Sequence, residues 1–128
     1  MENLFEKFNN GALLLPQSET SLAQLEWHDH PTFKGVQLKH IVTSDLTGGE
    51  FSCHLVRIAP NKKIGDHIHE KQLEIHEVID GFGVCINEEA ELKYNPGVIS
   101  LIKTGVPHEV TAGGDGLYLF AKFIPALC

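Results

Sequence analysis

Short apolar runs, each the length of a β-strand, follow one another from about residue 34 onward. The runs are GVQLKHIVT, EFSCHLVRIA, LEIHEVI, FGVCI, VISLI, HEVTA and LYLFAKFI. Between them lie the turn signals DLTGG, PNKK, DGFG, NPG and GGDG, in which glycine adopts positive φ without a Cβ clash. Many short strands at this spacing predict an all-β fold, a sandwich or an antiparallel barrel, with little room for βαβ crossovers.

The first ten residues differ from the rest because their apolar side chains follow a helical period. Leu4, Phe5 and Phe8 have this spacing, which predicts a short N-terminal helix that needs packing to be stable. With 128 residues, the chain fits one domain overall. We divide it into an N-terminal helix and arm, residues 1–33, and a barrel, residues 34–128.

The charge balance argues against nucleic acid as a partner. The formal net charge is −7, and the ten Lys and Arg residues are scattered instead of clustered against phosphates. The N-terminus lacks a basic leader, and its apolar run at residues 12–15 is far shorter than a signal core or a membrane span. We therefore expect a cytoplasmic protein that binds neither nucleic acid nor a membrane.

Cysteine is sparse in this chain. Cys53, Cys85 and Cys128 are odd in number and widely spaced, with no CxxC pair. This pattern indicates neither a disulfide framework nor a thiolate zinc site, so we expect buried or terminal thiols.

The segment GDHIHEKQLEIHEVIDG, residues 65–81, concentrates histidines and carboxylates beside a run of strand character. In an extended segment, His67 and His69 leave the same face of the sheet, so their imidazoles can converge. Glu74 follows after a stretch long enough for a turn into the next strand. Two imidazoles and a carboxylate from neighbouring strands form three corners of a first-row metal site, and a fourth ligand should come from elsewhere.

The residues His67, His69, Glu74 and Gly81 resemble the first motif of the cupin family in type and spacing. Cupins are small jelly-roll barrels of antiparallel strands, and this motif contributes ligands to a metal. The resemblance covers roughly residues 34 to 124. It implies a single-domain metal-binding cupin barrel.

The family's second motif contains a histidine that follows two spaced glycines. Gly97, Gly105 and His108 fall in those places, so the resemblance implies that His108 is the fourth ligand. Four positions depart from the two motifs, namely Asn61, Val98, Lys103 and Ala112. They lie outside the ligand set and weaken only the assignment of a subfamily.

Each of the four ligand candidates has an ordinary explanation when taken alone. His67 and His69 suit an exposed loop, Glu74 a surface charge, and His108 a hydrogen-bonded core position. Their joint occurrence at the family's spacing favours one bound divalent metal ion. Three imidazoles and a carboxylate accept Fe, Mn, Ni, Co, Cu or Zn, so the sequence does not select the metal.

Further candidate site residues come from strand alternation. His76 shares the phase of Glu74 and points toward the predicted cavity, as a catalytic base or substrate contact or, equally, as a buried structural histidine. On FSCHLVRIA the phase is open: Arg57 is a candidate carboxylate clamp if the Cys53 face points inward, and His54 joins the site if the other face does. A surface pairing is the simpler explanation for Arg57.

The motif WHDHP, residues 27–31, contains another pair of histidines one residue apart. No glutamate follows at a matching interval, and Pro31 interrupts the strand. We expect a structural role at the barrel mouth or in a dimer contact, with a second metal site as the lesser alternative. His40 lies in an apolar strand phase and is most simply a packed histidine.

The reaction cannot be deduced from the sequence itself. What the resemblance implies is a metal-dependent dioxygenase, decarboxylase, isomerase or lyase that acts on a small polar or carboxylated molecule; an Fe(II) dioxygenase is one concrete version. The alternative is a non-catalytic module that binds or senses a small ligand. Because exposed strand edges favour pairing between copies, we also expect a homodimer.

Overall fold

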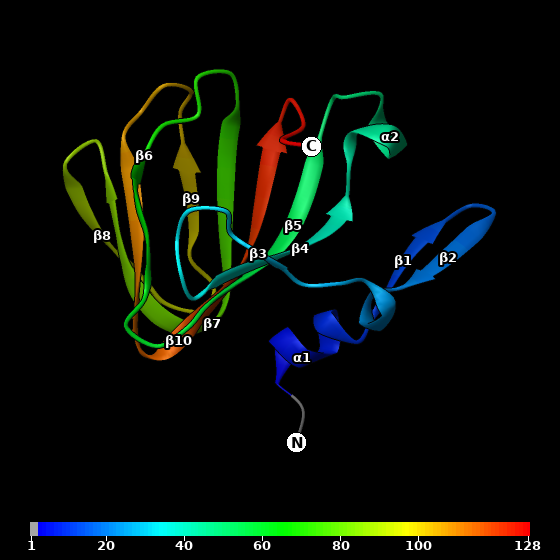
Figure 1. Ribbon diagram of the computed structural model, residues 1–128, viewed down its shortest axis with the longest axis horizontal. Helices are drawn as coiled ribbons and strands as arrows, with labels where there is room; N and C mark the ends of the chain where they lie inside the picture. Colours follow the sequence, from blue (N-terminus) through cyan, green and yellow to red (C-terminus); the bar gives the residue numbers. More distant parts are fainter. Residues whose placement is uncertain (1–2) are drawn as a thin grey trace.

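Antiparallel strands dominate the computed structural model, which describes residues 3–128 (Figure 1). In chain order the elements are α1 (Leu4–Asn9), β1 (Ala12–Leu15), β2 (Ser18–Ser21), the 3₁₀ turn η1 (Leu22–Gln24), β3 (His28–Asp29), β4 (Val36–Val42), α2 (Ser44–Thr47), β5 (Ser52–Ile58), β6 (Lys63–His67), β7 (Leu73–Asn87), β8 (Ala90–Tyr94), β9 (Ile99–Ile102) and β10 (His108–Ile124). The all-β architecture and the short N-terminal helix are as the sequence predicts. Among residues 3–128, no helix has the length and apolar character needed to cross a membrane.

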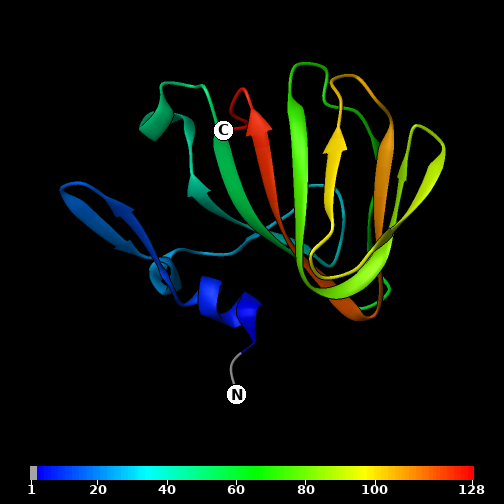
Figure 2. The same cartoon turned by 180° about the vertical axis from the view of Figure 1, so that it is seen from behind.

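The main sheet has the strand order β3-β4-β5-β10-β7-β8, with β6 added to β10 and β9 added to β7. Every pairing in it is antiparallel. The sheet curls around a common interior, as the two opposite views show (Figures 1 and 2). β3 comes from the predicted N-terminal arm but pairs with β4, so the arm and the barrel share this sheet.

Two of the predicted turns are wrong. β7 continues through DGFG and β10 continues through GGDG, so each is one long strand. Gly81 (φ 75°) and Gly116 (φ 81°) lie where the two strands bend together, and a Cβ on Gly81 would collide with the carbonyl oxygen of Gly116. Glycine therefore permits a close approach of two backbones and the sharp curvature of the barrel, instead of a chain reversal.

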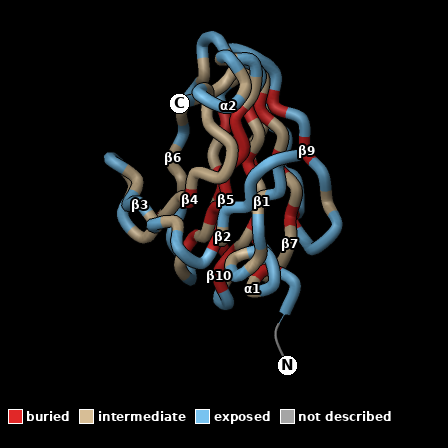
Figure 3. The backbone as a smooth tube through the Cα atoms, turned by 90° about the vertical axis from the view of Figure 1, so that its right-hand side faces the viewer, coloured by how far each residue is buried: buried red, intermediate tan, exposed pale blue. Residues whose placement is uncertain are grey.

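The interior of the barrel holds the core. Buried residues follow the centres of the strands, while the connecting loops are exposed (Figure 3). The central cluster includes Val56, Ile58, Tyr94, Leu117 and Leu119, each with at most 2% exposure.

The N-terminal unit packs on the outside of this barrel. Phe5 of α1 is buried against the rings of Tyr118 and Trp27, at centroid distances of 4.6 and 6.1 Å. The β1–β2 hairpin extends away from the barrel in both views, and Leu14 on it is 69% exposed (Figures 1 and 2). The helix is thus stabilised by tertiary packing, as expected for so short an element.

Candidate metal centre

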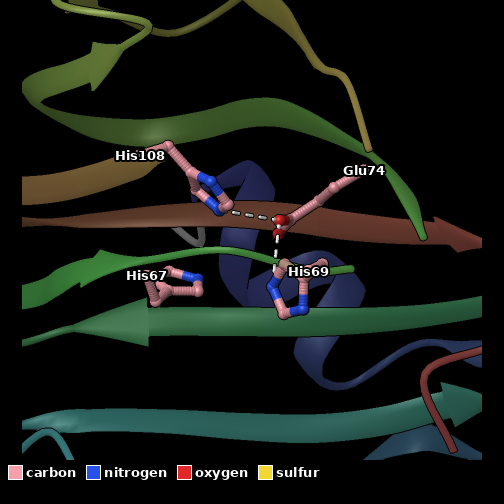
Figure 4. Close-up of side chains that lie close together, drawn as sticks. All are labelled: His67, His69, Glu74 and His108. Atoms are coloured by element: carbon pink, nitrogen blue, oxygen red, sulfur yellow. Dashed lines mark hydrogen bonds and ion pairs between the residues drawn. The ribbon is translucent and has the colours of Figure 1, made fainter. Parts of the chain in front are cut away.

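Four side chains converge inside the barrel from the ends of three strands (Figure 4). His67 is the last residue of β6, His69 follows two residues later, Glu74 is the second residue of β7, and His108 is the first residue of β10. One ligand atom of each residue lies within 4.8 Å of the others. We call this group the carboxylate cluster. Its distant members meet because β6 pairs with β10, which sets His67 opposite His108.

The distances within the carboxylate cluster suit a common ligand. The ring centroids of His67 and His108 are 4.2 Å apart, and those of His67 and His69 are 4.9 Å apart. Glu74 Oε1 lies 3.2 Å from His108 Nε2 and 3.4 Å from His69 Nε2. One carboxylate oxygen therefore faces two imidazole nitrogens, as around a shared metal ion.

Backbone carbonyls set the orientation of two of the rings. His67 Nδ1–H donates to the carbonyl oxygen of Gly65 at 2.7 Å, and His108 Nδ1–H donates to that of Val106 at 2.9 Å. With Nδ1 protonated, each neutral ring has its lone pair on Nε2. Such a hydrogen bond behind a ligand histidine is the usual way in which proteins fix its tautomer and rotation.

Burial and mutual charge set the ionisation of the cluster. Burial lowers the pKa of His67 and of His69. Burial acts to raise the pKa of Glu74, but His76 and His108 outweigh it and lower that pKa, so the carboxylate is ionised. For His108, the hydrogen bonds to Glu74 and Val106 outweigh burial and raise the pKa. A metal ion binding here would displace the proton of His108, since ligand imidazoles must be neutral.

A buried chain of hydrogen bonds holds Glu74 from behind. His76 Nε2–H donates to Glu74 Oε2 at 2.7 Å, and Tyr94 O–H donates to His76 Nδ1 at 2.8 Å. Glu74, His76 and Tyr94 are 5%, 2% and 0% exposed. His76 thus occupies the inward face that alternation predicts, but both its nitrogens are engaged, one of them by Glu74.

Three members of the carboxylate cluster, His67, His69 and Glu74, line a cavity of about 400 Å³. Apolar side chains form most of the remaining wall, among them Phe33, Leu38, Val56, Ile64, Leu119 and Phe123. This volume is within the range of about 300–1,000 Å³ that small-molecule sites occupy. The site therefore combines a concentrated set of polar ligands with an apolar chamber.

A family model described as the cupin domain matches residues 54–120, which include all four members of the carboxylate cluster. The chain belongs to the cupin family. The sequence has no significant match among curated proteins.

Solved structures share the cupin fold at low sequence identity. KdgF from Halomonas sp. matches with a TM-score of 0.71 and 18% identity, covering 80% of this chain and 88% of the other. A predicted oxalate decarboxylase from Thermotoga maritima matches with a TM-score of 0.73 and 20% identity, covering 80% and 95%. A sugar phosphate isomerase of the cupin superfamily from Silicibacter pomeroyi matches with a TM-score of 0.72 and 19% identity, covering 84% and 75%.

The structure resolves the open phase of β5 in this cupin. His54 is on the inner face and fully buried, with Nε2 2.8 Å from Ser52 Oγ. Arg57 is on the outer face, where its Nε–H donates to Gln37 Oε1 at 2.8 Å and its guanidinium lies 4.0 Å from the centroid of the Trp27 ring. The surface pairing considered for Arg57 is therefore what the barrel shows, and its guanidinium is directed away from the cavity.

Two further residues near the site were not assigned to it from the sequence. Tyr94, which contacts His76, precedes an ordinary NPG turn. His30 of the WHDHP motif lines the cavity, and its Nδ1 accepts the backbone N–H groups of Thr32 and Phe33 at 3.0 and 3.2 Å. His30 of that motif thus supplies part of the cavity wall, whereas Trp27 packs against Phe5 and the guanidinium of Arg57.

Proposed function

We propose that this cupin binds one divalent first-row metal ion through His67, His69, Glu74 and His108 and acts with it on a small carboxylated molecule in the adjoining cavity. The convergence of four ligand atoms within 4.8 Å at the cavity wall carries this proposal. Three imidazoles and a carboxylate suit Fe, Mn, Ni, Co, Cu or Zn, and the proposal leaves the metal open.

The bound ion would supply a Lewis acid or a redox centre, with positions left open for water, dioxygen or substrate oxygens. The chain's own residues do the rest. His76 holds the Glu74 carboxylate in place and serves here as a positioning residue, although it was first considered as a base. The walls around Phe33, Val56 and Leu119 exclude water and suit the carbon skeleton of a ligand.

The reaction class follows from chemistry that such a site can support. A ligand carboxylate binds readily to an ion with open positions, and the apolar chamber retains the remainder of the molecule. The name of one solved structure, a predicted oxalate decarboxylase, supports a small carboxylate, and that of another, a sugar phosphate isomerase, supports a small polar molecule more broadly. Decarboxylation, isomerisation, lyase chemistry and Fe(II)-dependent dioxygenation all remain within the proposal.

Metal binding at the carboxylate cluster is tested with Mn²⁺, an ion that prefers imidazole and carboxylate over thiolate. We expect electron paramagnetic resonance titration to show one tight site per chain. His69→Ala should weaken Mn²⁺ binding by more than about 100-fold, because the loss of a ligand costs more than the loss of an outer-shell partner. Glu70→Gln, an exposed carboxylate next to His69, is the matched control and should leave the titration unchanged. Equal binding in all three proteins would refute the site.

Turnover separates an enzyme from a ligand-binding module. The metal-loaded protein is incubated with a panel of small carboxylates while oxygen consumption, carbon dioxide release and changes in the ligand's NMR spectrum are followed. Conversion that His69→Ala abolishes supports the enzyme. Ligand binding without conversion across the panel would favour the sensor module instead.

We also propose that the protein is a cytoplasmic homodimer. Exposed apolar side chains of β9 support the homodimer, since Ile99 is 70% and Leu101 is 52% exposed. Apolar surface of this kind marks contact sites between proteins. Light scattering should give the mass of a dimer, and a monomeric mass would contradict this.

A further inference from the structure

A second group of ligand atoms lies on the other side of the barrel interior. One ligand atom from each of His40, His54 and Cys128 lies within 4.8 Å of the other two. His40 is on β4, His54 is opposite it on β5, and Cys128 follows the last strand. We call these three residues the thiol cluster. The ring of Phe123 lies between the two clusters, 5.6 Å from the ring of His54 and 5.1 Å from that of His69.

The two imidazoles face each other through the same nitrogen. His40 Nδ1 and His54 Nδ1 are 2.7 Å apart, so one of them carries a proton and donates it to the other. Behind His54, the Nε2 atom lies 2.8 Å from Ser52 Oγ. When Nε2–H donates to this hydroxyl oxygen, the lone pair of His54 is on Nδ1, directed at His40 and the thiol. This is the arrangement of a ligand histidine with its outer-shell partner.

Backbone hydrogen bonds keep the thiol next to the rings. Ser44 N–H donates to the carbonyl oxygen of Cys128 at 2.7 Å, and Leu127 N–H donates to Ser52 Oγ at 2.8 Å. Cys128 Sγ lies 3.9 Å from His40 Nδ1. Ser52 therefore contacts both the imidazole of His54 and the backbone that positions the thiol.

We propose that His40, His54 and Cys128 bind a second metal ion, of the Zn²⁺ type, at a site independent of the carboxylate cluster. Imidazole and thiolate together select zinc and copper among the common divalent ions. Zinc bonds of about 2.0–2.1 Å to nitrogen and about 2.3 Å to sulfur place tetrahedral N and N ligands about 3.3 Å apart and N and S ligands about 3.5 Å apart. The two Nδ1 atoms are 2.7 Å apart, and His40 Nδ1 is 3.9 Å from Cys128 Sγ. Small ring rotations would bring both distances to the values for zinc.

The site is accessible to an ion from solvent. Cys128 is exposed and His40 is half-buried, whereas His54 is fully buried. The ring of His28 stacks on that of His40, with centroids 4.9 Å apart, and limits its rotation. Binding would move the proton of His40 from Nδ1 to Nε2 through solvent and release the proton of the thiol, and it would fasten the C-terminal segment to β4 and β5.

Cobalt is the probe for this site, because a thiolate ligand gives Co²⁺ a sulfur-to-metal charge-transfer band in the near ultraviolet and the carboxylate cluster contains no sulfur. With the thiols kept reduced, wild type should show the band, and Cys128→Ser should lose it along with one Zn²⁺ equivalent per chain. Cys53→Ala, which removes a thiol from the outer face of β5, is the control and should keep the band. Zn²⁺ should also raise the melting temperature of wild type more than that of Cys128→Ser.

Two further variants make the result specific. His54→Gln should weaken Co²⁺ binding at the band by at least 10-fold, since it leaves only His40 and Cys128 as protein ligands. His69→Ala should keep the band, so a failure of the carboxylate cluster leaves this outcome intact. The proposal is overturned if wild type lacks the band, if Cys128→Ser retains it, or if His54→Gln binds as tightly as wild type.

Discussion

The carboxylate cluster and the thiol cluster lie in one barrel on either side of Phe123, yet their surroundings differ in kind. The carboxylate cluster places an ionised Glu74 among three imidazoles and opens on a cavity of about 400 Å³. The thiol cluster brings the imidazole rings of His40 and His54 together with a sulfur atom. A backbone hydrogen bond from Ser44 to Cys128 holds that sulfur in place. Both clusters contain histidines, so the histidines do not distinguish them. What distinguishes them is the ligand that joins the histidines, a carboxylate or a thiol, and the access to a cavity.

The largest expected effect is a loss of Mn²⁺ affinity at the carboxylate cluster with the thiol cluster unchanged. Glu74→Gln removes the charge that binds the ion, and we expect Mn²⁺ affinity to fall about 1,000-fold, or about 4 kcal/mol. The cobalt–sulfur band of the thiol cluster should stay. Paramagnetic titration and absorption spectra of the same samples measure both, with Glu70→Gln as the control. A parallel loss of both signals would mean that the two clusters are not independent.

Acid should distinguish the clusters in the metal-free protein. Burial first, and then His40, lower the pKa of His54 from 6.5 to about 4, although Glu74 acts to raise it. Because the folded pKa is the lower one, the unfolded chain binds more protons between these values. Stability from this group is complete above pH 6.5 and falls by up to about 3 kcal/mol as the pH drops to 4. His108 has the opposite sign, since its raised pKa adds stability below 6.5 that is lost as the pH rises through its folded pKa.

Urea unfolding of chelated protein across pH 4 to 7 tests this assignment. His54→Asn should flatten the dependence of the unfolding free energy on pH, whatever its effect at pH 7. His28→Asn is the comparison: this exposed histidine on β3 stacks on His40, so its removal should change the slope less than the loss of His54 does. An unchanged slope in His54→Asn would show that other histidines cause the acid sensitivity.

The smallest effect concerns the support behind the carboxylate. His76→Leu removes the donor to Glu74 Oε2, and we expect Mn²⁺ affinity to fall 10- to 100-fold, the usual range of about 1.4–2.7 kcal/mol for outer-shell partners. His76→Gln keeps an N–H at a similar reach and should restore most of the affinity. If both variants lower the melting temperature but bind Mn²⁺ like wild type, His76 is only structural.

The carboxylate cluster was accessible from sequence because its residues follow local rules. Alternation predicts that His67 and His69 converge, and their rings do, although β6 ends at His67 and His69 lies in the loop that follows. The same rule correctly places His76 beside Glu74 on the inner face of β7. His108 came only from the resemblance to cupins, since no local period connects it to Glu74. The metal-binding role of all four remains a prediction.

The thiol cluster could not be predicted in the same way. His40, His54 and Cys128 share no local spacing, and the odd number of widely spaced cysteines argued against a thiolate site. Only the pairing of β4 with β5 and the return of the chain end bring the three together. Long-range juxtaposition of this kind depends on the register of strands, which hydrophobic patterns do not specify between distant segments.

Strand prediction failed where side chains were polar or where glycine suggested a turn. β6 (KIGDH) and β8 (AELKY) lack an apolar run because most of their side chains are partly or fully exposed. Within DGFG and GGDG, Gly81 and Gly116 have the positive φ expected of a turn, but here this conformation bends two paired strands at a shift in their register. A glycine specifies local freedom, and the partner strand decides how it is used.

The bend at Gly81 and Gly116 makes the proposed metal site sensitive to the closure of the barrel. Glu74 is paired with Phe123, which lies at the opposite end of β10 from His108, and a straight ribbon would hold the two positions about 50 Å apart. In the barrel, Glu74 Oε1 and His108 Nε2 are 3.2 Å apart. The proposed metal affinity therefore depends on the whole curved ribbon meeting end to end. A barrel that opens or slips by one residue should lose the proposed ion while its strands, and its circular dichroism, still look intact.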